Sequence, residues 1–180
     1  MTNRSERGRA LALGLTRGTR DWAPGAARLR RWASAALGRR AAGRELSVRL
    51  VGRAESRRLN QRWRRIDKPT NVLSFPATRS VHAMSVGQPL GSQPLGTVPL
   101  GDLVICPRVV RDEARQQGKL LTAHWAHMVV HGSLHLLGYD HEQGGVEQRR
   151  MERREIDVLR RLGFANPYVQ RRDTKSRKPL

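Results

Sequence analysis

The chain has 180 residues, with 35 Lys and Arg against 15 Asp and Glu and a formal net charge of +20 at pH 7. This length favours one domain with a buried core, while the single cysteine excludes an intrachain disulfide and indicates a reducing compartment, for which the cytoplasm is the expected location. The charge favours a polyanionic partner, nucleic acid rather than a membrane, because no apolar run approaches the ~20 residues that span a bilayer and no long helix pairs a basic face with an aromatic one.

The first half of the chain is expected to alternate between strands and helices. Two of its segments alternate apolar with polar or small residues, which is typical of strands, and one carries apolar residues at helical spacing. The segment TNVLSFP is interpreted as a third strand. Pro24 and Gly38 stand where a helix commonly begins and ends, and Pro76 stops the last strand. The expected elements are a strand over 9–16, a helix over 24–38, a strand over 45–51, a basic helix over 54–64 and a strand over 70–76.

The second half is expected to supply one central strand and three helices. Residues 100–106 are apolar enough for a strand in the middle of a sheet. Pro107 and Gly118 mark the two ends of the next helix, an apolar helix follows over 122–137, and the last helix, over 146–162, carries mixed charges on its outer face. The expected fold class is therefore α/β (α+β): a single domain in which a small mixed four-stranded sheet packs against about five helices, with the helix over 122–137 at its centre.

The segment over 77–99 is rich in Pro and Gly and is expected to be a loop. The tripeptide Pro-Leu-Gly occurs at 89–91, 94–96 and 99–101, and this composition can propagate neither a helix nor a central strand. It is either a binding loop or, as we prefer, a duplication in a surface loop, since loops accept insertions at low cost. Around the loop we expect a basic N-terminal extension over 1–20 that can include the first strand, a domain over 21–168 and a basic disordered tail over 169–180.

Residues 131–141, HGSLHLLGYDH, contain three histidines in the pattern H-x-x-x-H-x-x-G-x-x-H. His131 and His135 are four residues apart and therefore project from one face of a helix. Gly138 can end that helix in the left-handed conformation, and the returning chain can then present His141. Three neutral imidazoles suit Zn²⁺ and leave one coordination position open, as in catalytic sites. The motif thus predicts one catalytic zinc ion per chain.

The same spacing occurs in metzincin proteases, but Gly132 stands where those enzymes carry the glutamate that takes a proton from water. Peptide hydrolysis by that route is therefore not expected. Phosphodiester hydrolysis depends less on a carboxylate at this position, because a metal ion lowers the pKa of water and nearby cations stabilise charge on the phosphate oxygens. We assign His127 a packing role or an outer contact to the metal ligands, and Asp140 or Glu142 would orient a histidine or accept a proton.

Residues 53–68, RAESRRLNQRWRRIDK, hold seven Lys or Arg against two acids. Trp63 lies among them and offers an aromatic face on which an unpaired base can stack. We interpret this basic segment as an RNA-binding surface, with Arg62, Trp63, Arg65 and Lys68 as its contacts. The alternative is a solvated helix face that has no partner.

Three blocks of the sequence match the signatures of one known family. Residues 131–141 match H-G-x-L-H-L-x-G-Y-D-H, residues 59–75 match L-N-x-x-[YW]-R-x-x-D-K-P-T-[ND]-V-L-S-F, and residues 100–106 match L-G-D-[IL]-V-I-C. On these blocks the chain resembles the YbeY family, ribosomal RNA maturation factors described as metal-dependent, single-strand-specific endoribonucleases. The resemblance extends from about residue 44 to 168, and its motifs are specific. The Arg-rich N-terminal extension and the Pro-Leu-Gly loop depart from the family.

The resemblance implies that His131, His135 and His141 bind zinc and that Arg64, which follows the aromatic residue of the second block, is the functional arginine. Arg65 takes that role if the register shifts by one. The resemblance also implies a cytoplasmic, zinc-dependent, single-strand-specific endoribonuclease that acts in ribosomal RNA processing, at the 3′ end of the small-subunit RNA, and in ribosome quality control. The implied partners are ribosomal RNA, ribosomal proteins and assembly GTPases, with no membrane, and we expect a monomer.

Two other functions are compatible with parts of the sequence. One is a non-catalytic, RNA-binding ribosome assembly factor whose zinc is structural. The basic composition fits that function equally well, and it predicts that a folded His135→Ala variant still supports ribosome assembly. The other is a peptidase, which Gly132 argues against and which cleavage of casein-like substrates would reveal.

Overall fold

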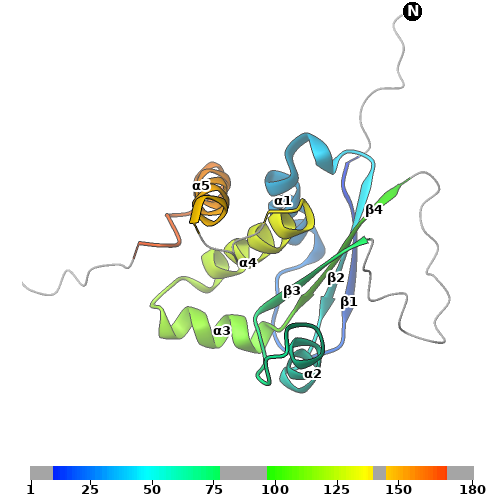
Figure 1. Ribbon diagram of the computed structural model, residues 1–180, viewed down its shortest axis with the longest axis vertical. Helices are drawn as coiled ribbons and strands as arrows, with labels where there is room; N and C mark the ends of the chain where they lie inside the picture. Colours follow the sequence, from blue (N-terminus) through cyan, green and yellow to red (C-terminus); the bar gives the residue numbers. More distant parts are fainter. Residues whose placement is uncertain (1–9, 78–96, 140–144, 170–180) are drawn as a thin grey trace, which may run out of the picture.

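The computed structural model describes residues 10–77, 97–139 and 145–169. These residues form a four-stranded sheet with helices on both faces (Figure 1). The predicted order of strands and helices is confirmed, with one short 3₁₀ helix, η1, in addition. In chain order the elements are β1 (Ala12–Arg17), α1 (Ala26–Leu37), η1 (Gly38–Ala41), β2 (Arg44–Leu50), α2 (Arg53–Arg64), β3 (Val72–Pro76), β4 (Val98–Ile105), α3 (Pro107–Gln116), α4 (Leu121–Leu136) and α5 (Gly145–Arg161). Residues 1–9, 78–96 and 170–180, which carry part of the predicted extension and most of the predicted loop and tail, lie outside the described residues.

β4 lies in the interior of the sheet, as predicted. The strand order is β1-β2-β4-β3, with β1, β2 and β4 parallel and β3 antiparallel to β4, so the expected mixed sheet is confirmed. β4 begins at Val98, earlier than the predicted residue 100, and its register against β2 shifts between Glu45 and Leu46. A strand can contain a proline such as Pro99 at an irregularity of this kind. From the sequence alone, Pro99 was assigned to the predicted loop.

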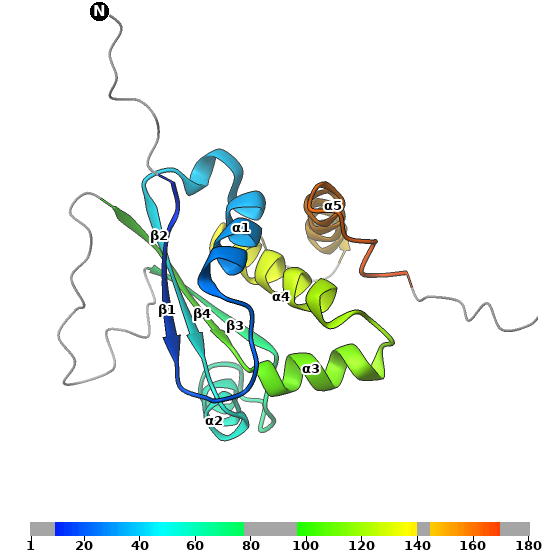
Figure 2. The same cartoon turned by 180° about the vertical axis from the view of Figure 1, so that it is seen from behind.

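The main core lies between one face of the sheet and the helices α1 and α4. α4 crosses this face and is covered in turn by α1, α3 and α5, with α5 farthest from the sheet (Figures 1 and 2). Trp125, Val129 and Leu134 of α4 are fully buried. A helix that is covered on most of its sides needs apolar residues around most of its circumference, which explains why the sequence over 122–137 is largely apolar apart from its histidines. The predicted central place of this helix is confirmed.

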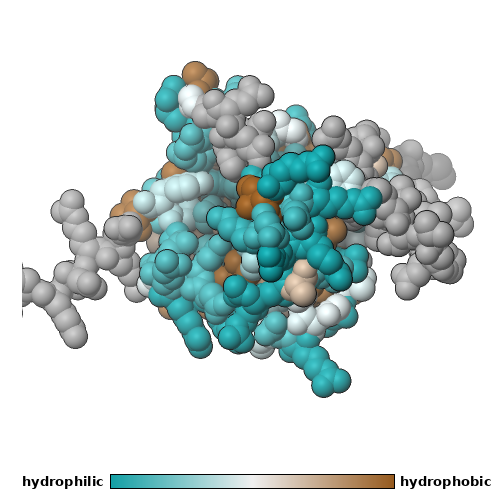
Figure 3. All heavy atoms as spheres, turned by 60° about the horizontal axis from the view of Figure 1, so that its bottom comes forward, coloured by the Kyte–Doolittle hydropathy of each residue, from teal (hydrophilic) through white to brown (hydrophobic). Residues whose placement is uncertain are grey.

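α2 packs against the opposite face of the sheet. Because side chains alternate between faces along a strand, Leu73 and Phe75 of β3 and Val104 of β4 point away from α4, and they form a second, smaller core with Leu59 of α2. The surface on the side where α2 lies is largely hydrophilic (Figure 3). Within the described part of the chain, no helix combines the length and the apolar character that a bilayer span requires.

Candidate metal centre

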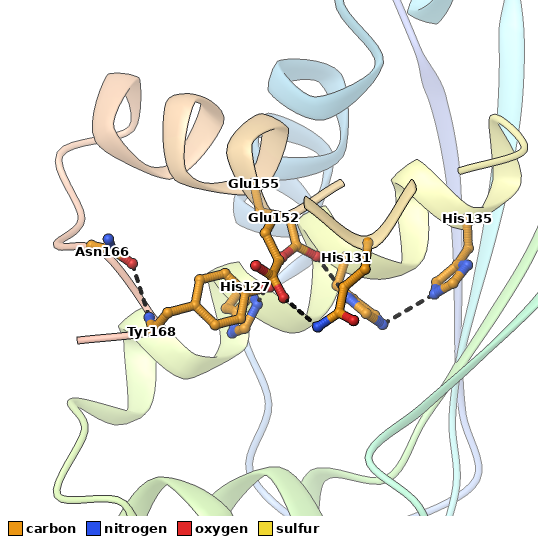
Figure 4. Close-up of polar contacts among 8 residues, drawn as sticks. His127, His131, His135, Glu152, Glu155, Asn166 and Tyr168 are labelled. Carbon is orange, nitrogen blue, oxygen red and sulfur yellow. Dashed lines mark hydrogen bonds and ion pairs between the residues drawn. The ribbon is translucent and has the colours of Figure 1, made fainter. Parts of the chain in front are cut away.

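Three histidines, one per helical turn, project from the same side of α4. His127, His131 and His135 are spaced four residues apart, which places their side chains on one face of the helix (Figure 4). The Nε2 atoms of His131 and His135 are 3.2 Å apart, and the planes of the two rings are inclined at 79°. The structure therefore brings together the two helical histidines of the 131–141 motif.

A buried carboxylate on α5 contacts His131. Glu155 is 0% exposed, and its Oε1 accepts a hydrogen bond of 2.7 Å from Nδ1 of His131, while its Oε2 lies 3.5 Å from Nε2 of His127. Burial by itself would raise the pKa of this carboxyl, but the two imidazoles more than offset burial and lower the pKa of Glu155 from 4.5 to about 2. The ionised carboxylate holds His131 with Nδ1 protonated and Nε2 directed toward His135.

The chain beyond α5 covers the other oxygen of Glu155. The backbone N–H of Tyr168 donates a hydrogen bond of 2.9 Å to Oδ1 of Asn166, and the ring of Tyr168 packs edge-on against His127 with ring centroids 5.6 Å apart (Figure 4). The Tyr168 hydroxyl donates to Oε2 of Glu155. Burial and the adjacent carboxylate raise the pKa of Tyr168, so the phenol stays neutral and keeps its proton for this contact.

The chemistry of this donor set fits a zinc ion. Zn–N bonds of 2.0–2.1 Å in a tetrahedral site place two ligand nitrogens about 3.3 Å apart. This separation is close to the 3.2 Å between the Nε2 atoms of His131 and His135. A hydrogen bond from Nδ1 to a carboxylate, such as the one from His131 to Glu155, is also the usual companion of a metal-binding histidine. His131 and His135 can therefore hold a metal ion, with Glu155 fixing the orientation of His131.

A second possible donor set overlaps the first. Ligand atoms of His127, His131 and Glu155 lie within 4.8 Å of one another. An ion bound between them would have to replace the 2.7 Å hydrogen bond between His131 and Glu155, whereas an ion on the Nε2 atoms of His131 and His135 leaves that bond intact. The second set therefore demands more rearrangement. His127, for which we expected packing or an outer contact, faces the carboxylate of Glu155.

Gly138 turns the chain out of α4, as its place in the motif predicts. Its φ is 85°, and its N–H donates to the carbonyl of His135 at 2.9 Å. The predicted third ligand His141 lies outside the described residues, and so do Asp140 and Glu142.

Gly132 marks a close approach between α4 and the sheet. A Cβ atom at this position would lie 2.8 Å from Leu103 Cδ2, 3.1 Å from Ser74 Oγ and 3.3 Å from Val72 Cγ2. A longer side chain here would be directed into β3 and β4. Packing therefore explains the glycine, and a carboxylate base of the metzincin kind has no room at this position.

The predicted RNA-binding residues lie at the C-terminal end of α2 and in the loop that follows it. Arg62, Trp63 and Arg64 occupy the last turn of α2, Arg65 is its C-cap, and Lys68 lies in the loop. All five are exposed. The structure thus presents them together on the surface, on an element different from the one that carries the histidines.

Trp63 and the histidine pair lie on opposite faces of β3. The ring of Trp63 packs edge-on against Phe75, with centroids 5.6 Å apart, and remains 39% exposed. On the other face Leu136, next to His135, approaches the sheet so closely that its Cδ2 lies 3.0 Å from the place of a Cβ at Gly101. A Cβ at Gly132, next to His131, would lie 3.1 Å from Ser74 Oγ of β3, so the helix that carries the histidine pair covers the face of this edge strand opposite to Trp63.

Two buried polar side chains of α2 hold the basic loop. Ser56 Oγ donates to the carbonyl of Thr70 at 2.8 Å and accepts from its N–H at 2.9 Å, and Asn60 Nδ2 donates to the carbonyl of Lys68 at 2.8 Å. Arg65 has a φ of 60°, and no other non-glycine residue in the described ranges has a positive φ. This left-handed conformation costs about 1–2 kcal/mol, which the surrounding contacts must offset.

His124, for which the sequence predicts no role, belongs to a separate cluster. Its Nε2 lies 2.9 Å from Oε2 of Glu113, and Asn71 Nδ2 donates to both oxygens of that carboxylate at 3.2 and 3.0 Å. These contacts join α3 and α4 to the start of β3. Their role is to hold the fold together.

Glu155 and Tyr168 were not predicted from the sequence. A signal for Glu155 was present, because it shares the buried face of α5 with Met151, Val158 and Leu159, and an acid on such a face needs a buried partner. No comparable signal marks Tyr168, whose contact depends on the return of the chain toward α4.

Comparisons with known proteins cover most of the chain. Residues 23–163 match the family model of the endoribonuclease YbeY. The chain is 50% identical to the endoribonuclease YbeY of Pseudomonas entomophila (strain L48), over 88% of this chain and 94% of that protein, and 49% identical to the one of Stutzerimonas stutzeri (strain A1501), over 82% and 85%. The solution structure of TM1509 from Thermotoga maritima aligns with a TM-score of 0.49 and 23% identity over 92% of this chain and 99% of that one. Because the matched range includes both the histidine helix and the basic segment, and the identity to the relatives is high, this chain belongs to the endoribonuclease YbeY family.

Proposed function

We propose that this protein is a zinc-dependent, single-strand-specific endoribonuclease that acts in ribosomal RNA processing, at the 3′ end of the small-subunit RNA, and in ribosome quality control. The observation that carries the proposal is the distance of 3.2 Å between the Nε2 atoms of His131 and His135, in a chain of the endoribonuclease YbeY family. Glu155 accepts a hydrogen bond from Nδ1 of His131 and so orients this histidine. We further propose a cytoplasmic monomer whose partners are ribosomal RNA, ribosomal proteins and assembly GTPases.

His131 and His135, together with His141 from the sequence motif, would hold one zinc ion per chain. When bound, zinc supplies Lewis-acid chemistry for phosphodiester hydrolysis. Glu155 keeps Nδ1 of His131 protonated, so Nε2 would offer its lone pair to the ion. Because Glu155 is fully buried, solvent does not compete for this hydrogen bond.

Arg64 would clamp the scissile phosphate and strengthen its contact as negative charge develops on the phosphate oxygens. Arg62, Arg65 and Lys68 would bind flanking phosphates, and the exposed ring of Trp63 would stack on an unpaired base. The basic segment packs on one face of the edge strand β3 and the histidine helix on the other, so an RNA strand that passes around this edge would contact both.

A second candidate function is a non-catalytic RNA-binding assembly factor with a structural metal. The observation that favours it is the contact of Glu155 with His131, because an ion on that histidine would also stabilise the packing of α5 on α4. Basic residues serve both functions equally, so only turnover separates them.

The test is cleavage of a labelled single-stranded ribosomal RNA fragment by the wild type, His135→Ala and His82→Ala. His82 provides the matched control, because it is a histidine outside the 131–141 motif. Zinc content and thermal unfolding are measured on the same preparations. A His135→Ala protein that stays folded but loses zinc and cleavage, while His82→Ala keeps both, supports the nuclease. A wild type that binds the RNA without cutting it, together with a His135→Ala protein that loses zinc and stability, would establish the assembly factor instead.

A further inference from the structure

A groove next to the histidine helix is lined by arginines. It has a volume of about 400 Å³ and runs along α5 beside the end of α4. Asp157 is the one acidic residue among the described residues that line it. The lining residues that matter here are Tyr139, Arg149, Arg150, Arg153, Arg154 and Asp157.

The four arginines form two pairs along one side of α5. Arg149 and Arg153 are four residues apart, as are Arg150 and Arg154, so each pair shares a side of the helix and spans about 6 Å along its axis. Arg149, Arg150 and Arg153 are exposed, and Arg154 is half-buried. This arrangement sets positive charges in two short rows, which can pair with phosphates of a nucleic-acid strand.

Acidic neighbours neutralise little of this charge. Glu147 Oε2 lies 3.8 Å from Arg150 Nη1, and both side chains are more than half exposed. Such exposed pairs are weak, and the arginine can readily exchange the carboxylate for another anion. Within the described ranges, no carboxylate forms an ion pair with Arg149, Arg153 or Arg154. Three of the four guanidinium groups therefore lack a carboxylate partner among the described residues.

Tyr139 gives the groove an aromatic wall. The guanidinium carbon of Arg150 lies 5.6 Å from the centroid of the Tyr139 ring, and that ring is half-buried. An arginine placed over a ring keeps its planar group oriented while its N–H donors stay available to an anion. Cations beside aromatic rings are the combination by which proteins bind single-stranded nucleic acid.

We propose that this arginine groove binds the phosphate backbone of single-stranded RNA next to the histidine pair. The inference rests on the proposed function and adds an RNA-binding surface separate from the basic segment over 53–68. The same helix carries both features, because Glu155 contacts His131 from the inner side of α5 while the arginines occupy its outer side. Tyr139, which lines the groove, follows directly on the turn that ends the histidine helix and stands four residues after His135 in the sequence.

The experiment measures binding of a labelled single-stranded RNA by fluorescence anisotropy over a range of salt concentrations. Chelator is present, so that no RNA is cleaved during the measurement. The groove variant replaces four arginines by glutamine: Arg149→Gln, Arg150→Gln, Arg153→Gln and Arg154→Gln. The matched control removes the same charge from exposed arginines of α1 and α3: Arg28→Gln, Arg30→Gln, Arg31→Gln and Arg115→Gln. Thermal unfolding of both variants checks the fold, and the two arginine pairs are replaced separately if the fourfold variant does not fold.

We expect the groove variant to bind at least about tenfold more weakly than the control at moderate salt. Its slope of log affinity against log salt should be shallower by about 0.7 for each phosphate that the variant no longer neutralises. Equal reductions of affinity in the two variants would overturn the proposal, since net charge alone would then account for binding, and so would unchanged affinity of the groove variant. Because binding is measured without metal, a protein that cleaves no RNA can still show the groove effect. A protein that cleaves RNA but shows no groove effect would refute the groove alone.

Discussion

Nδ1 of His131 lies 2.7 Å from Oε1 of Glu155, a buried carboxylate on a different helix. The contact joins the central helix α4 to the outermost helix α5, and it fixes which nitrogen of His131 can bind a metal. A buried charge of this kind is tolerated only when it has partners, and His127 and His131 supply them. The orientation of the metal donors is therefore coupled to the packing of the two helices.

Replacing the charge of Glu155 should weaken metal binding without unfolding the protein. Glu155→Gln keeps an oxygen that can accept from Nδ1 of His131, and losing the charge of such a support typically lowers metal affinity about 10- to 100-fold. Zinc affinity is measured by competition with a chelator. The control is Glu152→Gln on the same helix, because Glu152 contacts Gln148. Equal zinc affinities in the two variants would show that Glu155 does not support the ligand.

Removing the hydroxyl of Tyr168 should destabilise the fold. A hydrogen bond to a charged group contributes about 1.5–3 kcal/mol to the free energy of unfolding. Because Tyr168 is 47% exposed, we expect Tyr168→Phe to lower this free energy by an amount near the lower end of that range. Urea unfolding at neutral pH measures the difference, and Tyr139→Phe controls for the removal of a tyrosine hydroxyl elsewhere. Unchanged stability of Tyr168→Phe would mean that solvent replaces the contact at no cost.

Gly132→Ala should lower stability although alanine is the better helix former. Relative to glycine, alanine in a helix interior gains about 1 kcal/mol. Here the added Cβ would lie 2.8 Å from Leu103 Cδ2, and crowding of a packed core costs about 1–3 kcal/mol. Ala123→Gly in the same helix measures the effect of helix propensity alone. If Gly132→Ala proved more stable than the wild type, the sheet would have room for a side chain at this position.

The cluster around Glu113 should make stability depend on pH in the acid range. Burial raises the pKa of Glu113, but hydrogen bonds from His124 and Asn71 more than offset it and lower the pKa below 4.5. A carboxyl whose pKa is lower in the folded than in the unfolded state contributes stability above the unfolded pKa, and this contribution is lost as pH falls through the folded pKa. Below about pH 4.5 the wild type should therefore lose stability more steeply than Glu113→Gln. Urea unfolding between pH 7 and pH 3 tests this, and parallel curves would contradict it.

Arg64→Ala should reduce cleavage of single-stranded RNA far more than it reduces RNA binding. The reason is that a clamp on the scissile phosphate acts mainly in the transition state, whereas a positioning contact acts in both states. Cleavage rates and anisotropy are measured on the same RNA, and Arg65→Ala, the alternative candidate for the same role, is measured beside it. Equal reductions of cleavage and binding in Arg64→Ala would make it a positioning contact.

Local sequence patterns were enough to predict the helices and strands and part of the metal site. Alternation in residues 45–51 and the apolar run in 100–106 identified two strands of the sheet, because burial on one or both faces leaves a periodic trace in the chain. The four-residue spacing of His131 and His135 placed them on one helical face for the same reason. The strands and the helical histidine pair could be predicted because each depends on residues that are close together in the sequence.

Contacts between distant segments were decided by the tertiary structure. Glu155 reaches His131 only because α5 packs on α4, and the arginine groove exists only because that packing leaves one side of α5 toward solvent. The reason for a glycine at position 132 likewise depends on β3 and β4, whose side chains fill the space that a Cβ would occupy. A periodic pattern reports which face of an element is buried, whereas the partner on that face is selected by packing among elements far apart in the chain.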